Sequence, residues 1–435
     1  MLAVNLGDLI SPMSPDEFRN GLLGQRQHIF DGPATRFSKM LPWAELNRIL
    51  RYHYLDSTRI RLTANHKAVP QDEYNPYVPT FPGTRSPARH RELDVGALTR
   101  LLGAGATMKI RAIDELHEPI ARLAASAEQI VRERVSIDAF ISWGETPGYG
   151  VHWDPDEVLV IQVHGRKNWA VYGPTKPWPP IVGSSVFGPG SPDDAPEDPL
   201  QRLVLTTGQM LFIPRGWWHE VTPINEPSVH LSLHFARSTG LDLITWLAAR
   251  MDEAVLQQDL PRPAEMPERS RQYLQLFREA VLSRLSSPAL LDAFFTSHDG
   301  ALPCRDAFNL PEALNSDGFP QSQDYWVIWL ASSAILTSEK QETTIHTAGR
   351  RYRFAAEWLP ALTVLAQGEP LSIEDIGRRA GMATDTVRKI VAELLTEGLA
   401  AVKRTAPGST VPFGNLPNAD PDAARQPPQG KETST

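Results

Sequence analysis

Cysteine is almost absent from this 435-residue chain, which contains only Cys304. A single cysteine excludes an intrachain disulfide and a metal site built from thiolates. A long apolar segment is also missing, because the longest apolar run, from Tyr325 to Leu336, is too short to span a bilayer. The opening residues have an early acidic side chain and no basic stretch ahead of an apolar core, so we expect no secretory signal. These absences predict a protein of the reducing cytoplasm without a membrane segment.

An excess of basic residues is missing as well. The chain has 43 Lys and Arg against 51 Asp and Glu, which gives a formal net charge of −8. This balance argues against nucleic-acid binding by the whole chain and suits a basic protein or peptide partner. The motifs G-x-x-x-x-G-K-[ST], G-x-S-x-G and H-E-x-x-H do not occur. The sequence therefore offers no phosphate-binding loop, serine-hydrolase elbow or zinc-protease helix.

What the sequence does contain is a set of candidate metal ligands in a region typical of short strands. His152 and Asp154 are two residues apart, so on an extended segment their side chains point to the same face. A third candidate, His219, follows an apolar strand and the turn Pro214-Arg215-Gly216. A lone strand histidine is more often structural, but two imidazoles and one carboxylate are the ligand set of non-haem Fe(II) oxygenases.

Around these candidates the chain resembles a known family. The patterns GxxxHxD, VxxxQxxGRKxW and GxxLFIPxGWWHE, between Phe140 and Phe235, resemble the JmjC-type ribosomal oxygenases of the cupin superfamily, especially the bacterial protein-arginine hydroxylases. The resemblance implies a dioxygenase that uses Fe(II), 2-oxoglutarate and O2. Such an enzyme hydroxylates a side chain of a protein or peptide, for example a ribosomal protein, and releases succinate and CO2. His152, Asp154 and His219 would hold the iron.

The same resemblance implies a pocket for 2-oxoglutarate. Lys167 matches the family's basic residue that pairs with the distal carboxylate, and a buried cation suits a dicarboxylate inside a barrel. Arg166 is the alternative, because only one of two adjacent strand residues can point inward. Further contacts with the cosubstrate or the metal pocket are implied at Ser142, His230 and Ser232.

Other ring side chains near the motif have open roles. His230 and His234 lie on one strand face, and a core position fits each as well as a ligand contact does. His164 lies in the turn VHGRK, where we expect it in solvent. Four aromatic residues are candidates for the substrate mouth, with core packing as the alternative: Tyr149, Trp153, Trp217 and Trp218.

Changes of pattern divide the chain into four parts in an overall α+β fold. Residues 1–240 are predicted to form a double-stranded β-helix, the cupin or JmjC barrel, with flanking helices. Residues 241–340 have helical periodicity; the resemblance implies a homodimerisation segment, and packing on the chain's own barrel is the alternative. Residues 341–404 have the outline of a winged-helix-like domain. Residues 405–435, rich in Pro and Gly, are expected to be disordered.

The distribution of charged residues indicates which partners the chain can bind. The second helix of the winged-helix-like part has a net negative charge, which argues against DNA binding; its charged residues are Asp385, Arg388, Lys389, Glu393 and Glu397. A Pro-rich insertion in the barrel ends with Asp193, Asp194, Glu197 and Asp198. This insertion is either a solvated loop or a rim that attracts a cationic substrate.

Other functions stay open on the residues alone. A tailoring oxygenase of a ribosomally made peptide or an amino-acid-derived metabolite would use the same ligands. Demethylation would use the same chemistry. A regulator that combines a ligand-sensing cupin with a DNA-binding domain is disfavoured by the complete ligand set and the acidic helix, and a cupin scaffold with a vestigial metal site is the non-enzymatic alternative.

Overall fold

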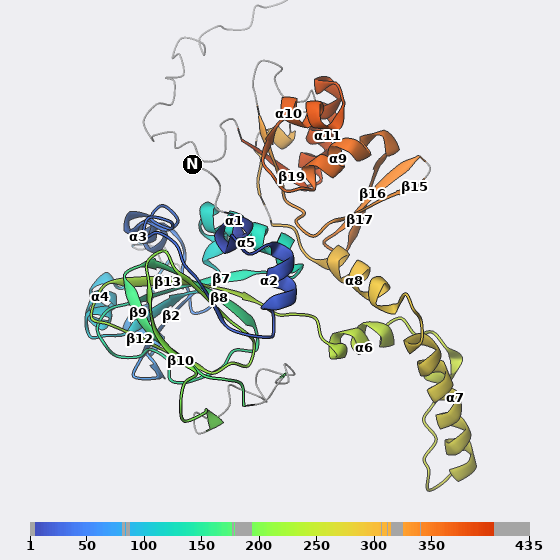
Figure 1. The fold of residues 1–435 in the computed structure, drawn as a ribbon, viewed down its shortest axis with the longest axis horizontal. Helices are drawn as coiled ribbons and strands as arrows, with labels where there is room; N and C mark the ends of the chain where they lie inside the picture. Colours follow the sequence, from blue (N-terminus) through green and yellow to red (C-terminus); the bar gives the residue numbers. More distant parts are fainter. Residues whose placement is uncertain are drawn as a thin grey trace, which may run out of the picture.

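A computed structural model describes residues 5–80, 83, 88–175, 178, 194–305, 307–310, 312–314, 325–339 and 341–403. Figure 1 shows a barrel body, an arm of helices and a smaller C-terminal body. The predicted disordered tail and most of the acidic insertion, Asp193 included, lie outside the described residues. No helix in the described part of the chain is long and apolar enough to cross a membrane.

The barrel body is built from a larger and a smaller antiparallel sheet that face each other. Within the described residues the larger sheet has eight strands in the order β1-β11-β8-β13-β7-β6-β2-β3, and the smaller has the order β10-β9-β12. The larger sheet comprises β1 (His28–Phe30), β2 (Ile60–Ala64), β3 (Lys67–Ala68), β6 (Thr107–Ile110), β7 (Ser136–Ser142), β8 (Glu157–His164), β11 (Met210–Ile213) and β13 (Ser228–Phe235). The smaller sheet comprises β9 (Arg166–Val171), β10 (Gln201–Thr206) and β12 (His219–Pro223). The predicted double-stranded β-helix is confirmed.

Alternation of side chains along each strand divides the barrel into an inside and an outside. On β8, Leu159 and Ile161 face outward into the main core, whereas Val158 and Val160 point inward. The inward residues pack against Trp169 of the opposite sheet. Since β8 is buried on both faces, it is almost continuously apolar, as expected for a central strand.

Helices cover the outer face of the larger sheet, where their apolar sides join the main core. They are α1 (Leu6–Ile10), α2 (Pro15–Gly21), α3 (Trp43–Tyr52), α4 (Val95–Gly103) and α5 (Glu118–Val131). The capping box at Ser14 is present, because Ser14 Oγ accepts from Glu17 N at 3.2 Å while Glu17 Oε2 accepts from Ser14 N at 2.7 Å. α5 begins at Glu118, after a separate 3₁₀ turn, η2 (Ile113–Glu115). A separate hairpin comprises β4 (Tyr77–Pro79) and β5 (Arg89–Arg91).

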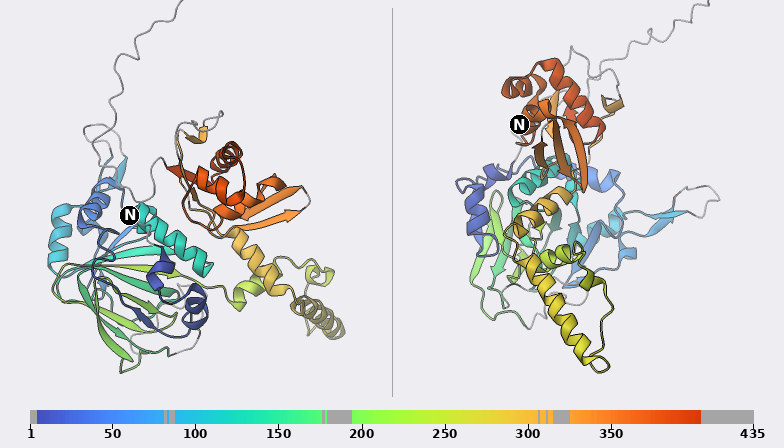
Figure 2. Two further views of the ribbon diagram at one scale, coloured as in Figure 1. Left: turned by 45° about the horizontal axis from the view of Figure 1, so that its top comes forward. Right: turned by 90° about the vertical axis from the view of Figure 1, so that its right-hand side faces the viewer.

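The arm between the bodies is helical, as the periodicity predicted. Its helices are α6 (Gly240–Ala248), α7 (Pro267–Leu285) and α8 (Leu290–Ala301). Figure 2 shows α7 projecting away from both bodies. Little of α7 is therefore buried: Ser270 and Tyr273 are its buried residues.

The C-terminal body contains a boundary that the sequence analysis placed wrongly. β15 (Ile335–Glu339) pairs with β16 (Glu342–Thr347), so the boundary predicted at residue 340 falls within a hairpin. The remaining strands are β14 (Trp326–Trp329), β17 (Arg350–Ala355), β18 (Leu371–Ser372) and β19 (Ala400–Lys403), and the helices are α9 (Leu359–Leu365), α10 (Ile373–Ala380) and α11 (Thr384–Thr396). The apolar run from Tyr325 thus contains β14 and the start of β15 and is not the end of a helical segment, because periodicity cannot separate strand from helix in so short a run. Ser372 caps α10, accepting from Asp375 N at 3.1 Å.

Buried ion pairs connect the end of the arm to the barrel body. Arg305, 9% exposed, lies 2.6 Å from Asp114 and 2.9 Å from Glu128, and donates to the carbonyl of Val135 at 2.6 Å. Asp114 Oδ1 also accepts from the N–H of Ile137 at 2.8 Å, which anchors the start of β7. These contacts connect the C-terminal part to a strand of the barrel.

Candidate metal and cosubstrate site

Backbone pairing brings the candidate ligands together. His152 N–H donates to the carbonyl of His219 at 3.1 Å, and His219 N–H donates to the carbonyl of His152 at 2.7 Å. The carbonyl of Asp154 accepts from Gly216 N–H at 3.0 Å. Gly216 has a φ of 79°, a left-handed conformation that suits glycine in this tight turn. The short bridge therefore places residues that are distant in the sequence on one wall.

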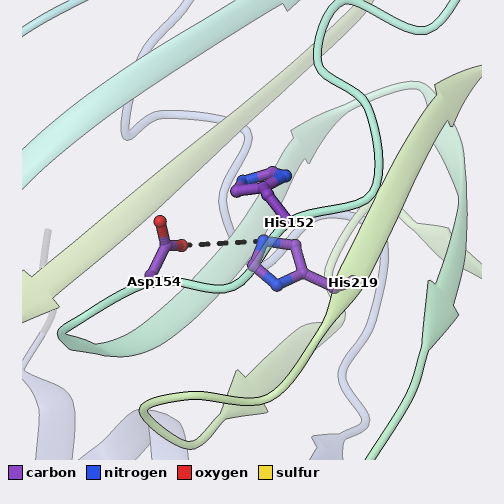
Figure 3. Close-up of side chains that lie close together, drawn as sticks. All are labelled: His152, Asp154 and His219. Carbon is purple, nitrogen blue, oxygen red and sulfur yellow. Dashed lines mark ion pairs between the residues drawn. The ribbon is translucent and has the colours of Figure 1, made fainter. Parts of the chain in front are cut away.

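The three predicted ligands form a compact cluster. One ligand atom from each of His152, Asp154 and His219 lies within 4.8 Å of the others. His219 Nε2 is 3.6 Å from Asp154 Oδ2, and the two imidazole centroids are 4.4 Å apart. Figure 3 shows the carboxylate of Asp154 directed toward the His219 ring. Two imidazoles and a carboxylate in this arrangement fit a facial metal site with open positions.

Hydrogen bonds orient both imidazoles for metal binding. His152 Nδ1 lies 2.8 Å from the carbonyl of Gly150, and His219 Nδ1 lies 3.2 Å from the carbonyl of Trp217. A carbonyl only accepts, so each Nδ1 carries the proton and each Nε2 keeps its lone pair. Burial, and then the neighbouring His152, lower the pKa of His219 to about 4. The neutral form that a metal requires is therefore the stable one at pH 7.

A cavity of about 270 Å³ extends from this cluster to Lys167. Lys167 is 1% exposed, and its Nζ donates to the carbonyl of Phe140 at 3.2 Å and to His230 Nδ1 at 2.9 Å. Within the described residues it has no carboxylate partner, and burial lowers its pKa to about 7. Arg166 is exposed and pairs with Glu226 at 3.0 Å. Of the two adjacent cations, Lys167 is the one that lines the cavity.

The other predicted contacts also line this cavity. Ser142 is completely buried, and its Oγ has no hydrogen-bond partner among the described residues, which is unusual for a buried hydroxyl. Ser232 is 4% exposed and lies on the same strand face as His230. His230 stacks on Phe140 with ring centroids 4.8 Å apart, and burial followed by the charge of Lys167 holds its pKa well below the usual value. A neutral His230 can therefore accept a hydrogen bond from Lys167.

The remaining ring side chains divide between the cavity and the core. Tyr149 lines the cavity. Trp218 is 1% exposed and its Nε1 donates to Thr175 at 2.9 Å, so it is a core residue. The expectation that His164 is in solvent is wrong: its Nε2 lies 2.7 Å from the carbonyl of Leu41 and its ring stacks on Trp43. The turn itself is at the surface, but the ring folds back onto α3.

A polar group that the sequence did not predict lies beside the candidate metal ligands. Lys109 of β6 lies 2.8 Å from Asp138 of β7, and His234 Nε2 lies 3.9 Å from the same carboxylate. Lys109 and His234 line the cavity together with Asp154. Alternation along β6 is the signal that identifies this group, since Thr107 and Lys109 are two residues apart and both line the cavity.

The fold and this cluster define a protein with a JmjC-type barrel. Residues 115–243 match the family model of the JmjC domain. Human ribosomal oxygenase 1 is 23% identical over 274 residues, which cover 61% of this chain and 40% of that protein. The bifunctional lysine-specific demethylase and histidyl-hydroxylase NO66 of Drosophila persimilis is 32% identical over 100 residues, which cover 23% of this chain and 14% of that protein. The chain thus spans less than half of these curated relatives.

Solved structures show the same fold over most of the chain. The X-ray structure of Escherichia coli YcfD superposes with a TM-score of 0.53 at 16% identity and covers 90% of this chain and 99% of that chain. YcfD, a ribosomal oxygenase, in complex with cobalt and 2-oxoglutarate superposes with a TM-score of 0.52 at 16% identity, over 90% of this chain and 99% of that chain. Together these comparisons confirm the resemblance to the JmjC ribosomal oxygenase family.

Proposed function

We propose that this protein is an Fe(II)- and 2-oxoglutarate-dependent dioxygenase that hydroxylates a side chain of a protein or peptide. The observation that carries this proposal is one cavity with the cluster of His152, Asp154 and His219 at one side and the buried, uncompensated Lys167 at the other. His152, Asp154 and His219 would hold the metal, and Lys167 would pair with the distal carboxylate of 2-oxoglutarate. The relatives named ribosomal oxygenases support a ribosomal protein as the substrate.

Each side chain has a definable task in this reaction. Bound iron with 2-oxoglutarate would supply the activation of O2, with succinate and CO2 as coproducts. His152, Asp154 and His219 would hold the metal, and the carbonyls behind both imidazoles would keep their Nε2 atoms directed at it. Lys167 would offer its remaining N–H, and Ser142 its free hydroxyl, to the distal carboxylate. Trp169 and Val160 would exclude water from this end of the cavity.

The proposal is tested by succinate formation from 2-oxoglutarate in anaerobically prepared, Fe(II)-loaded protein. A pool of ribosomal peptides should stimulate turnover and gain 16 Da in its hydroxylated member. Asp154→Ala should lower turnover at least about 100-fold, because it removes a metal ligand rather than a residue behind one. Circular dichroism should remain unchanged. Equal activity in this variant, or an N-demethylated product, would overturn the proposal as stated.

The C-terminal body supports a winged-helix-like assignment without a role in DNA binding. It combines α9, α10 and α11 with the antiparallel sheet β18-β14-β19. A sharp turn at Gly381, with a φ of 66°, separates α10 from α11. The acidic side chains on α11 disfavour phosphate contacts. We assign this body to packing or protein contacts, and location in the cytoplasm stays a prediction from the sequence.

The helical arm supports the proposal of a homodimer. Apolar side chains on α6, α7 and α8 are left exposed in the single chain: Leu241 at 52%, Ile244 at 59%, Leu274 at 60%, Leu282 at 51%, Leu291 at 57% and Phe295 at 46%. Such a set is expected to be covered by a partner surface. A second copy would bury it, and light scattering of Leu274→Glu against the parent protein would test this assembly.

A further inference from the structure

A second cavity, of about 530 Å³, adjoins the metal cluster. Lys109, Asp154 and His234 line both this cavity and the one that ends at Lys167. The wall of the second cavity includes Arg111, which is exposed to solvent. The first cavity instead ends at Lys167, which is 1% exposed. The second cavity is therefore an approach from solvent to the metal ligand Asp154, separate from the cosubstrate pocket.

Strand register places the two cavities at opposite ends of one inner surface. His230 pairs with Phe140, and these residues contact Lys167. Four residues further along β13, His234 pairs with Ser136, and both line the second cavity. At about 3.3 Å per residue the two pairs are roughly 13 Å apart along the strands. A molecule in the second cavity would thus face the metal from the side away from the cosubstrate.

Most charges on the wall of the second cavity are compensated. Arg59 forms an ion pair with Glu115, and Lys109 lies 2.8 Å from Asp138. The carboxylate of Asp156 differs, because it has no hydrogen bond or ion pair with any other described residue. Asp156 is partly buried, so solvent alone does not satisfy its oxygens fully.

Asp156 is therefore the carboxylate on this wall that lacks a direct ion pair among the described residues, and the charge of Arg215 acts on it only from a greater distance. Arg111 also has no ion pair among the described residues, but it is exposed at the rim, where water solvates its guanidinium. Asp154 would be neutralised by the metal that it binds. A ligand group that satisfies the remaining carboxylate must donate hydrogen bonds and is favoured by a positive charge.

We propose that Asp156 binds the cationic head of the substrate side chain and so holds one of its aliphatic carbons beside the metal. This inference rests on the proposed function. Arginine and lysine each have a charged head on a chain of methylene groups, so an anchored head leaves C–H bonds to be directed toward Asp154. Asp156 and Asp154 line the same cavity, which gives this alignment a physical basis. Asp156 is accordingly a specificity-determining residue.

The test uses the full chain loaded with Mn(II), which replaces iron, and with 2-oxoglutarate. The probes are the capped tripeptide Gly-Arg-Gly and its neutral citrulline analogue. Paramagnetic broadening of the side-chain methylene signals by Mn(II), followed by NMR during a titration, reports affinity and proximity to the metal. The arginine peptide should show strong broadening of its methylene signals. Both the citrulline peptide and the Asp156→Asn variant should bind about 10-fold or more weakly, as expected for loss of a hydrogen bond between charged groups.

Matched variants distinguish recognition of the cationic head by Asp156 from a general effect of removing a negative charge. Asp156→Glu should retain preference for the arginine peptide. Asp72→Asn, the same chemical change at an exposed carboxylate outside both cavities, should bind as the parent protein does. All variants should bind 2-oxoglutarate with affinities within about twofold of one another, because Lys167 and Ser142 are unchanged.

The outcomes distinguish this inference from the proposed function. If the parent protein binds Mn(II) and 2-oxoglutarate but Asp156→Asn binds the arginine peptide equally well, only the role of Asp156 is wrong. Equal affinity for the citrulline peptide, or absence of peptide binding to the loaded parent protein, would also overturn the inference. If the parent protein binds neither the metal nor 2-oxoglutarate, the proposed function fails and the inference with it.

Discussion

Lys167 and Arg305 are both almost completely buried cations, at 1% and 9% exposed, but their surroundings differ. Arg305 lies against the carboxylates of Asp114 and Glu128; burial alone would lower its pKa, but Glu128 and Asp114 outweigh this effect and raise it. Among the described residues, the partners of Lys167 are the carbonyl of Phe140 and the ring of His230, and burial lowers its pKa to about 7. One cation is satisfied by the fold itself, and under the proposed function the other would be satisfied by an anionic ligand. This is the difference expected between a structural site and a binding site.

The largest expected effect on stability comes from removing the satisfied cation. Arg305→Ala leaves Asp114 and Glu128 buried without their partner, which should lower the free energy of unfolding by about 3–5 kcal/mol. Urea denaturation followed by circular dichroism measures this loss. Arg284→Ala, which breaks exposed pairs with Asp252 and Glu253, is the control and should cost about 1 kcal/mol or less. Equal losses in the two variants would remove the distinction between Arg305 and a surface pair.

The complementary change at Lys167 should affect ligand binding instead. Lys167→Met should weaken 2-oxoglutarate binding about 100-fold, because the distal carboxylate loses a charged donor in a buried site. Calorimetric titration of the Mn(II)-loaded protein measures the affinity. The free energy of unfolding should not fall, since a buried charge without a counterion is removed. A loss of stability comparable to that of Arg305→Ala would mean that Lys167 is structural.

The lowered pKa of Lys167 makes its binding role dependent on pH. The ammonium form, which pairs with a carboxylate, predominates in the free protein below pH 7, the pKa in the fold. The affinity for 2-oxoglutarate should therefore fall as the pH rises from 7 toward 9, by up to about tenfold per unit. Lys167→Arg should abolish this dependence, because a guanidinium stays charged. A flat profile in the parent protein would contradict a lowered pKa.

The smallest expected effect lies in the ion-pair group formed by His298 of α8 with Asp299 and Glu133. Hydrogen bonds with Asp299 and Glu133 raise the pKa of His298 to about 9, from an ordinary value of 6.5. Because this pKa is raised in the fold, the stabilisation is complete below pH 6.5 and is lost as the pH rises through 9. After allowance for solvent screening we expect about 1 kcal/mol.

The change should be visible in thermal melts of the parent protein at pH 6 and pH 9.5. His298→Gln should lose this part of the pH dependence while keeping the rest. If the parent protein and the variant respond equally to pH, His298 does not stabilise the contact between the arm and the barrel body.

Much of the site followed from local sequence, and the reason is geometric. On an extended chain, residues two apart share a face, so His152 and Asp154 had to point the same way wherever the segment lay. A capping box depends on four consecutive residues, so the helix after Ser14 could be predicted with its first residue. In each case the interacting atoms belong to one short segment.

Only the tertiary structure decided the features that depend on pairing between distant strands. Alternation required one of Arg166 and Lys167 to be buried, but the pairing of β9 with β10 and β12 determined that it was Lys167. The strand at Trp326 became part of the C-terminal body because β18 and β19 provide its hydrogen bonds. The cavity beside Asp156 exists because the ends of β6, β7 and β13 meet there, and no local pattern specifies that meeting. Local sequence determines the strand face on which a side chain lies. Pairing between distant strands determines which residues that face contacts.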